Sequence, residues 1–349
     1  MRVELVADLH AAAQTSLTGV PERPDSPLLS VVAPVLDEVE LIDAFVERVT
    51  AALAGERLEL VIVDDGSTDG TAQRLDALAE ADPRLRVLHL SRNFGHQAAL
   101  TAGLEHATGD AVVMIDADLQ DPPEVIPELV QRWRDGADVV YAVREHRAGE
   151  SRFKLATARW FYRLFNTLTE MKLEPDSGDF RLLDRRALDA LLCMRERSRF
   201  LRGMTVWVGF TQTGVSYQRD PRHAGETKYT LRRMVRFSLD AISSFSHAPL
   251  QLATYFGFAL AAIAFLAMPV IVLLRLLGNY QSGFATLTLV VLLLGGIQLI
   301  AVGVLGEYLG RIYDEVKQRP LYLVREERGG PPDQLPPRPV NVSEERVGQ

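Results

Sequence analysis

The stretch Ala111-Val112-Val113-Met114-Ile115-Asp116-Ala117-Asp118 decides the fold, because an apolar run ends directly in two acidic residues. A short run that is apolar on consecutive positions is typical of a parallel strand covered by helices on both faces. Similar β-rich runs alternate with helical patterns from residue 28 onward, at 29–35, 58–63, 86–90 and 139–143. This alternation predicts an α/β domain with a doubly wound sheet.

Polar residues follow three of the predicted strands at the point where each strand ends. In such sheets, ligands bind outside the carboxyl ends of the strands. The three groups are Asp37-Glu38, Asp64-Asp65-Gly66-Ser67 and Asp116-Ala117-Asp118. We expect them to lie along one edge of the sheet.

Asp116 and Asp118 are candidate ligands of a divalent metal, because Mg²⁺ and Mn²⁺ prefer oxygen ligands and can neutralise a diphosphate leaving group. On an extended strand end, these two carboxylates and Gln120 would point to the same side. Two acidic residues before a helix can also simply cap or solvate it. Pro122 and Pro123 do predict a helix start just beyond.

The bulk composition allows one large domain and a smaller part. The chain has 349 residues, of which 47% are hydrophobic and 24% are charged, and its formal net charge is -8. A negative chain has no general attraction for nucleic acid, so no nucleic-acid partner is expected. Its one cysteine, Cys193, excludes an internal disulfide. Residues 1–27 lack the pattern of a signal peptide and are expected to form a flexible leader.

Two long uncharged stretches follow the predicted α/β domain, 27 residues at 248–274 and 31 residues at 276–306. A hydrocarbon core requires ~20 residues, so they predict two transmembrane helices, at about 248–274 and 284–306. A pair of buried core helices is the alternative. Basic residues on the outer flanks place both flanks in the cytoplasm: Arg232, Arg233, Arg236, Arg311, Lys317 and Arg319.

The remaining domain boundaries follow from these stretches. Residues 28–230 are expected to form a cytoplasmic catalytic domain, and 307–349 a cytoplasmic C-terminal tail that is disordered beyond Arg325. Residues 231–247 are expected to form an amphipathic helix that would lie in the membrane interface, although a core helix gives the same pattern. Its apolar positions are Leu231, Val235, Leu239, Ile242 and Phe245.

Four segments of the chain resemble glycosyltransferase family 2. They are Val63-Asp64-Asp65-Gly66-Ser67-Thr68-Asp69-Gly70-Thr71, Ser91-Arg92-Asn93-Phe94-Gly95, Asp116-Ala117-Asp118-Leu119-Gln120-Asp121 and Gly178-Asp179-Phe180-Arg181-Leu182. The fold that the resemblance implies is GT-A, with a doubly wound mixed sheet. Over residues 28–324 the chain is similar to the polyprenyl-phosphate glycosyltransferases, which include bactoprenol glucosyltransferases and dolichol-phosphate mannosyltransferases.

The resemblance implies a role for each residue of the donor site. Asp65 would recognise the nucleoside, Asp116 and Asp118 would serve the metal and the diphosphate, and Gln120 would assist metal binding. The nucleotide-sugar site would comprise Pro34, Glu38, Asp65, Asp116 and Ala117, and the catalytic residues would be Asp118 and Asp179. Asp179 would act as a base or would orient Arg181. The tyrosine and asparagine usual in the family are replaced by Leu36 and Asp37, which puts stacking on the nucleobase in doubt.

Basic residues are concentrated after Tyr217, where the stretch 222–229 resembles the acceptor loop of the family. Basic side chains clamp phosphates, and the predicted ligands of the acceptor phosphate are Arg144, Arg181, Arg219, Arg222 and Lys228. Each of these residues also has an alternative role without a catalytic function. The cluster can be a charge patch near lipid headgroups, Arg144 can pair with Glu145, and Arg181 can pair with a nearby carboxylate.

Together these observations predict a metal-dependent inverting transfer of glucose from UDP-glucose to undecaprenyl phosphate, by a multi-pass protein of the cytoplasmic (inner) membrane. The resemblance also implies a homotetramer. GDP-mannose is the alternative donor, and a noncatalytic nucleotide-sugar-binding scaffold is the alternative from another class. A processive polysaccharide synthase would carry more membrane spans. A dehydrogenase would need a glycine-rich loop after the first strand, where residues 35–40 contain no glycine.

Overall fold

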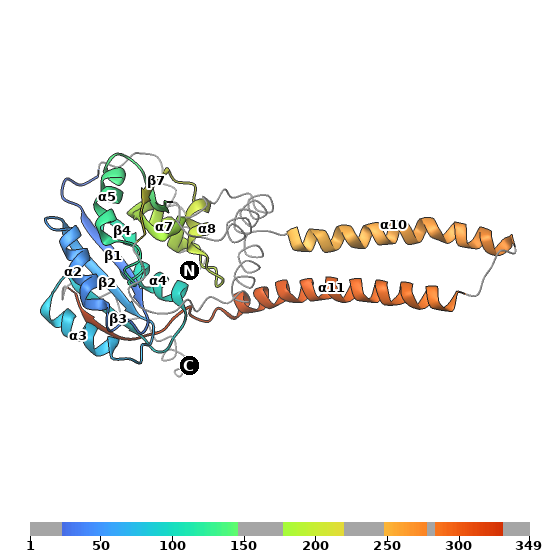
Figure 1. Cartoon of the computed structure of the whole chain (residues 1–349), viewed down its shortest axis with the longest axis horizontal. Coiled ribbons are helices and arrows are strands. Elements are labelled where there is room, and N and C mark those ends of the chain that lie inside the picture. Colours follow the sequence, from blue (N-terminus) through green and yellow to red (C-terminus); the bar gives the residue numbers. More distant parts are fainter. Residues whose placement is uncertain (1–22, 146–176, 220–247, 278–282, 331–349) are drawn as a thin grey trace, which may run out of the picture.

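The computed structural model describes residues 23–145, 177–219, 248–277 and 283–330 (Figure 1). An α/β domain occupies one end, and a pair of long helices projects from it. The interfacial helix predicted at 231–247 and most of the predicted leader lie outside the described residues.

The core of the domain is an eight-stranded mixed sheet in the order β7-β5-β6-β4-β1-β2-β3-β8. Strands β1 to β4 are parallel to their neighbours among themselves, β5 is parallel to β7, and β6 and β8 are antiparallel to theirs. The strands are β1 (Leu28–Val35), β2 (Arg57–Asp64), β3 (Leu85–Leu90), β4 (Ala111–Met114), β5 (Val139–Arg144), β6 (Ser177–Asp184), β7 (Gln212–Tyr217) and β8 (Val324–Gly329). The predicted α/β class and mixed sheet are therefore confirmed.

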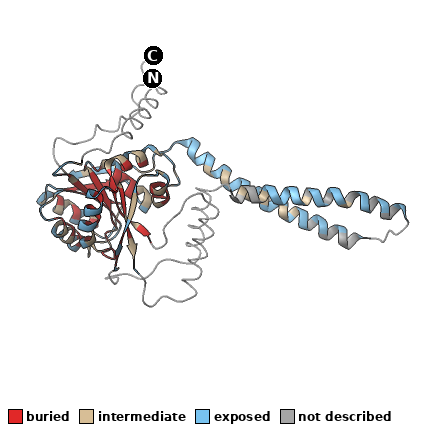
Figure 2. Ribbon diagram, turned by 90° about the horizontal axis from the view of Figure 1, so that it is seen from above, coloured by how far each residue is buried: buried red, intermediate tan, exposed pale blue. Residues whose placement is uncertain are grey.

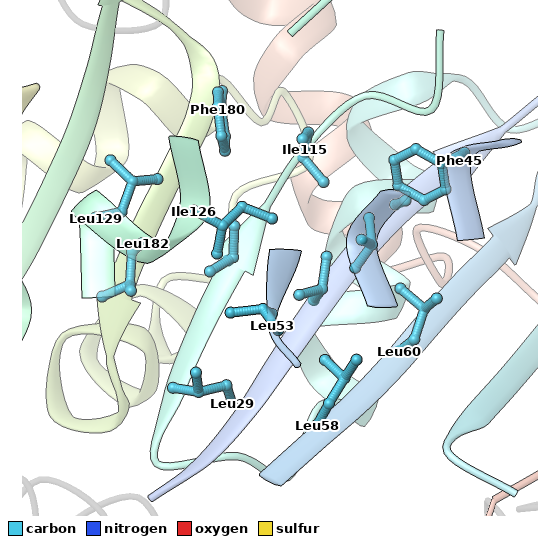
Figure 3. Close-up of a cluster of buried hydrophobic side chains, with 14 of the residues drawn as sticks. Leu29, Phe45, Leu53, Leu58, Leu60, Ile115, Ile126, Leu129, Phe180 and Leu182 are labelled. Carbon is cyan, nitrogen blue, oxygen red and sulfur yellow. The ribbon is translucent and has the colours of Figure 1, made fainter. Parts of the chain in front are cut away.

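Helices cover both faces of the sheet, so that residues on both sides of the central strands are buried. One face carries α2 (Ile42–Ala52), α3 (Thr71–Ala81) and α5 (Ile126–Arg134), the last preceded by the single turn η1 (Pro123–Val125). Figure 3 shows part of the buried cluster on this face, where Phe45 and Leu129 meet the strands. The other face carries α4 (His96–His106), α7 (Arg185–Cys193) and α8 (Leu201–Trp207).

The C-terminal region differs from the expectation. Helix α11 (Phe284–Lys317) continues beyond residue 306, where the predicted tail begins. The tail was also expected to be disordered beyond Arg325, which is wrong for the part up to Gly329, because β8 pairs with β3 at the edge of the sheet. The sheet therefore incorporates chain from both sides of the helix pair.

The helix pair consists of α10 (Ala248–Leu276) and α11, which run side by side away from the domain (Figures 1 and 2). Among the described residues, one helical stretch is long and apolar enough to cross a membrane, at Leu293–Lys317, and none of it is buried. Two spans are therefore not confirmed. The alternative of buried core helices does not fit, since large apolar side chains such as Phe258, Phe265 and Leu299 are exposed. Figure 2 shows that most of the described part of both helices is exposed.

Candidate active site

Several strand ends converge at one edge of the sheet. Val35 lies opposite Asp64 at the carboxyl ends of β1 and β2, and Val32 lies opposite Met114 at the end of β4. Strand β6 runs the other way, so its amino end reaches the same edge, with Arg181 opposite Met114. The expectation that the three polar groups share an edge is confirmed, and β6 adds Asp179 to them.

His96, at the start of α4, lies between two carboxylates. Its Nε2 is 3.6 Å from Asp116 Oδ1 and 3.4 Å from Asp179 Oδ2. Burial lowers the pKa of His96, but contact with Asp179 and the charge of Asp116 outweigh it and raise the pKa to about 9. Burial and the neighbouring carboxylates raise the pKa of Asp116 to about 6, against the opposing charge of His96. The group therefore concentrates charge of both signs at the end of β4.

Asp179 is held by further partners on both of its oxygens. Gln97 Nε2 donates to Oδ2 at 3.1 Å, and Arg202 Nη2 lies 3.6 Å from Oδ1. Burial alone would raise the pKa of this carboxyl, but His96 and Arg202 hold it well below its usual range. Gln97 also accepts a hydrogen bond from Leu201 N at 3.0 Å, so α4 and α8 are tied together behind Asp179.

Arg181 does not face the site, which contradicts its predicted contact with an acceptor phosphate. The residue is 2% exposed, and its guanidinium donates to Gly178 O at 2.8 Å and to the Thr205 hydroxyl. Burial lowers its pKa to about 10, against the charge of Asp179. Thr205 belongs to α8, so the side chain lies beneath that helix and away from solvent. The alternative of an ion pair with a nearby carboxylate is not found among the described residues, where a carbonyl and a hydroxyl accept its hydrogen bonds.

Asp118 is oriented by its neighbour Gln120. The amide N and the Nε2 of Gln120 donate to the two oxygens of Asp118 at 3.0 and 2.7 Å. The extended strand end that we expected here is not present, because β4 ends at Met114 and the chain turns through Leu119 with a φ of 56°. Ala117 and Leu119 are buried, whereas Asp116 and Asp118 are partly exposed. Gln120 thus contacts Asp118 through its NH₂ group and fixes the direction of that carboxylate.

The donor set fits a metal that is shared with a substrate. No group of three or more His, Cys, Asp or Glu side chains arranged to hold a metal occurs among the described residues. Asp116 and Asp118 remain, and Mg²⁺ is typically held by one or two carboxylates together with substrate phosphates and water. These two residues therefore suit a cation that binds with a nucleotide diphosphate.

The site edge has two parts: the β2 half, with Asp37, Asp64 and Asp65 after β1 and β2, and the β4 half, with Asp116 and Asp118 after β4. The carboxylates of the β2 half hold loops together. Asp65 accepts hydrogen bonds from Phe94 N and Gly95 N at 2.7 and 2.9 Å. Burial raises the pKa of Asp65 more than these bonds lower it. Asp37 accepts a hydrogen bond from Thr68 N at 2.7 Å and so joins the loops after β1 and β2. Of the other predicted nucleotide ligands, Pro34 and Ala117 are buried and Glu38 is partly exposed.

The predicted acceptor residues are only partly described. Arg144 pairs with Asp121 at 3.3 Å, not with Glu145, and its Nε donates to the Tyr217 hydroxyl at 3.1 Å. Arg219 lies 3.4 Å from the same Asp121. Two guanidinium groups therefore share one buried carboxylate. Arg222 and Lys228 lie outside the described residues.

Three residues of the site were not predicted: His96, Gln97 and Arg202. His96 and Gln97 directly follow Phe94-Gly95 after the third strand, so the rule that pointed to the aspartates also applies to them. No local pattern marks Arg202, because α8 reaches Asp179 only through the packing of the domain.

Comparison with known proteins identifies the family to which the chain is similar. Residues 30–192 match the sequence model described as Glycosyl transferase family 2. The "uncharacterized glycosyltransferase YkcC" of Bacillus subtilis is 46% identical over 303 residues, which cover 86% of this chain and 94% of that protein. The "prophage bactoprenol glucosyl transferase homolog" of Escherichia coli K12 is 43% identical over 300 residues, which cover 85% of this chain and 98% of that protein.

Likeness to solved structures is weaker. A mannosyltransferase from Pyrobaculum calidifontis in complex with GDP-Man and Mn²⁺ is 18% identical, with a TM-score of 0.42 over 88% of this chain and 98% of that one. A likeness at this level carries no argument about the donor or the metal. The family follows from the sequence relatives, because their similarity spans most of both chains. The chain belongs to glycosyl transferase family 2.

Proposed function

We propose that the protein transfers glucose from UDP-glucose to a polyprenyl phosphate, with inversion at the anomeric carbon, at the cytoplasmic face of the membrane. The observation that carries this proposal is the meeting of Asp116, Asp118 and the His96–Asp179 pair at one sheet edge, in a chain with exposed apolar helices. Relatives named bactoprenol glucosyl transferase support the choice of sugar and lipid.

The donor end of the site would use the β4 carboxylates. Asp116 and Asp118 would hold Mg²⁺ or Mn²⁺, which would neutralise the charge that grows on the leaving diphosphate. Gln120 keeps Asp118 in the required direction through its two hydrogen bonds. His96 supplies positive charge beside Asp116. The loops joined by Asp37 and Asp65 would shape the nucleoside pocket.

The acceptor end requires little help from a base. A phosphate monoester has a second pKa of ≈ 6, so its attacking oxygen is already largely ionised near neutral pH. Asp179 has both oxygens engaged by His96, Gln97 and Arg202, and we assign it to positioning those groups. Arg144 and Arg219 together exceed the charge of Asp121, and with Arg222 and Lys228 they would receive the lipid phosphate.

We assign α10 and α11 to two membrane spans, with the catalytic domain in the cytoplasm. Many of the described apolar side chains on both helices are exposed, and such a surface is unfavourable in water but suits lipid. A polyprenyl tail cannot leave the bilayer, so an enzyme that uses it must work at the interface.

The test is a transfer assay with the full chain in vesicles that contain undecaprenyl phosphate. Labelled UDP-glucose, other UDP-sugars and GDP-mannose are supplied in parallel with Mg²⁺ or Mn²⁺, and the lipid phase is extracted. We expect label in lipid from UDP-glucose, with inverted anomeric configuration by NMR. Transfer from GDP-mannose alone would favour the mannosyltransferase. Failure with every donor would favour the noncatalytic scaffold, and a retained configuration would overturn the single displacement.

A further inference from the structure

The chain returns from α11 to the catalytic domain through a short connection. Helix α11 ends at Lys317, Gln318 turns the chain with a φ of 48°, and Ser91 N donates to Leu323 O at 2.8 Å. Residues 318–322 therefore bridge the end of the helix and the first sheet contact. Five residues reach ~17 Å at most. So short a bridge restricts how far the domain can move from the end of the helix.

The end of α11 and this bridge also bind the outside of the domain. Arg197 N donates to Glu315 Oε1 at 2.7 Å, and the Arg197 guanidinium donates to Arg319 O. Tyr322 donates its hydroxyl proton to Glu105, and its ring lies 6.4 Å from the ring of His106. We call residues 315–329 the return segment.

The last part of the return segment is locked into the sheet. Strand β8 pairs with β3, and Glu327 forms an ion pair with Arg86, which is 3% exposed. Arg86 also donates to His106 O at 2.9 Å. A Cβ at Gly329 would overlap Leu85 O, so the two strands are in close contact there. The segment is therefore anchored at both of its ends.

Each element that the return segment contacts carries site residues elsewhere along its length. Glu105 belongs to α4, which begins with His96 and Gln97. Ser91 begins the loop whose Phe94 and Gly95 bind Asp65. Arg197 lies in the loop that leads to Leu201 and Arg202, which bind Gln97 and Asp179. The end of the membrane helix is thus joined to the site by three short paths.

We infer that the return segment is a positioning element, which holds the catalytic site at a fixed height above the bilayer, where the lipid phosphate lies. The lipid acceptor in this inference rests on the proposed function. A phosphate anchored in the interface cannot adjust its own depth freely, so reaction requires that the site be held at the matching level. A water-soluble acceptor has no such requirement.

The height can be measured without any activity, because the exposed Cys193 is the only cysteine of the chain. A dye on Cys193 and a second dye on lipid headgroups report the distance by energy transfer in vesicles. The test variant combines Glu315→Ala with Tyr322→Phe, which removes the two side-chain hydrogen bonds to Arg197 N and Glu105 and leaves the Arg319 O contact and the pairing of β8 in place. Glu315→Gln keeps an acceptor oxygen for Arg197 N, and Glu307→Ala on the same helix removes an ion pair with Arg311, at 3.2 Å, that lies outside the return segment.

We expect one narrow distribution of energy-transfer efficiencies for the wild type, Glu315→Gln and Glu307→Ala. For the double variant we expect a broadened distribution. Transfer of sugar to undecaprenyl phosphate in vesicles should fall about tenfold in the double variant, because misplacement by an ångström already slows reactions strongly. Transfer to a short, water-soluble prenyl phosphate and the Kd for the nucleotide sugar should not change.

An unchanged energy-transfer distribution in the double variant would overturn the inference. So would equal loss with both acceptors, since that pattern means that the site itself has been damaged. A narrow wild-type distribution that broadens in the double variant, in a protein that glycosylates no lipid, would instead retain the positioning element and reject the proposed acceptor.

Discussion

The two halves of the site edge use carboxylates in different ways. In the β2 half, Asp64 accepts hydrogen bonds from Ser67 N at 2.8 Å and contacts His89 at 2.9 Å, and Asp65 accepts from two backbone amides. In the β4 half, Asp116 has a side chain that is about a third exposed, and it faces His96 at 3.6 Å. The carboxylates of the β2 half accept hydrogen bonds from the protein itself. In the β4 half, several charged side chains lie close together.

The pKa shifts of Asp64 and Asp116 differ in direction, although burial raises the pKa of Asp65 as well. His89 and Ser67 overcome burial and lower the pKa of Asp64, whereas burial and nearby carboxylates raise that of Asp116 to about 6. A satisfied carboxylate mainly fixes the shape of a loop, while a crowded one is stabilised by an added cation. The comparison suggests that the β2 half builds the pocket and the β4 half binds the charged part of the substrate.

The largest effect is expected from breaking the β4 half. Asp118→Ala should lower the rate of sugar transfer by about 10³-fold, because stabilisation of a leaving diphosphate by a held cation is worth several kcal/mol. The rate is measured in vesicles at saturating donor and metal. The matched control is Asp37→Asn, whose amide oxygen can still accept from Thr68 N. Equal losses in the two variants would contradict the division between the halves.

The next largest effect is expected from His89, which forms a buried pair with Asp64 of the β2 half. His89, 1% exposed, contacts Asp64 at 2.9 Å and Asp76 at 3.0 Å. His89→Gln should lower the free energy of unfolding by about 3 kcal/mol, because it leaves a buried carboxylate without its cation. Equilibrium unfolding in detergent gives the value, and sugar transfer should fall less than in Asp118→Ala.

The loss in His89→Gln should also depend on pH. Hydrogen bonds to Asp64 and Asp76 raise the pKa of His89 above 6.5, so its contribution is complete below that pH and fades as the pH rises through the raised value. The pKa of Asp64 is below 3.8, so its contribution is present above that pH and is lost in stronger acid. The two conditions overlap between 3.8 and 6.5, where the destabilisation should be largest. A larger loss in alkaline solution would contradict the ion pair.

Strands that carry their own pattern could be predicted from the sequence. The runs that form β1 to β5 are rich in apolar and β-branched residues, and each starts and ends within about two residues of its predicted limit. Strand β8 reads Val324-Arg325-Glu326-Glu327-Arg328-Gly329, which has the composition of a solvated tail. It becomes a strand because the edge of β3 offers backbone partners and Arg86 offers a charge, and neither is visible locally.

The same limit applies to the site. The acidic residues could be found because each follows an apolar run. Whether a given side chain is buried or reaches the site could not be predicted. Arg181 follows Phe180 in a motif of the family, yet its place inside a sandwiched strand buries it. Arg202 reaches Asp179 through helix packing that no spacing in the sequence encodes. Local pattern therefore predicts which edge is used, and tertiary packing decides which side chains reach it.

The smallest effect concerns Gly66, at the turn where the loop after β2 packs against the loop after β3. Gly66 has a φ of +79°, and a Cβ there would lie 2.8 Å from the backbone of Arg92 and Asn93. Gly66→Ala should cost about 2 kcal/mol of unfolding free energy, since an L-residue is strained at this φ and the contact is with backbone that cannot rotate away. The matched variant is Gly55→Ala, with a φ of +94° and nothing within 4 Å, for which we expect about 1 kcal/mol.

The two glycine variants distinguish the effect of backbone strain from the effect of displacing the loop that contacts Asp65. The Arg92 to Gly95 loop, which Gly66→Ala would push, supplies the two amides that bind Asp65, so the Kd for the nucleotide sugar should rise about threefold to tenfold if that loop shapes the pocket. Gly55→Ala carries similar backbone strain far from these amides and should leave the Kd unchanged. If both variants lose stability but neither changes the Kd, then the β2 half is scaffold alone, and the nucleoside must be held elsewhere.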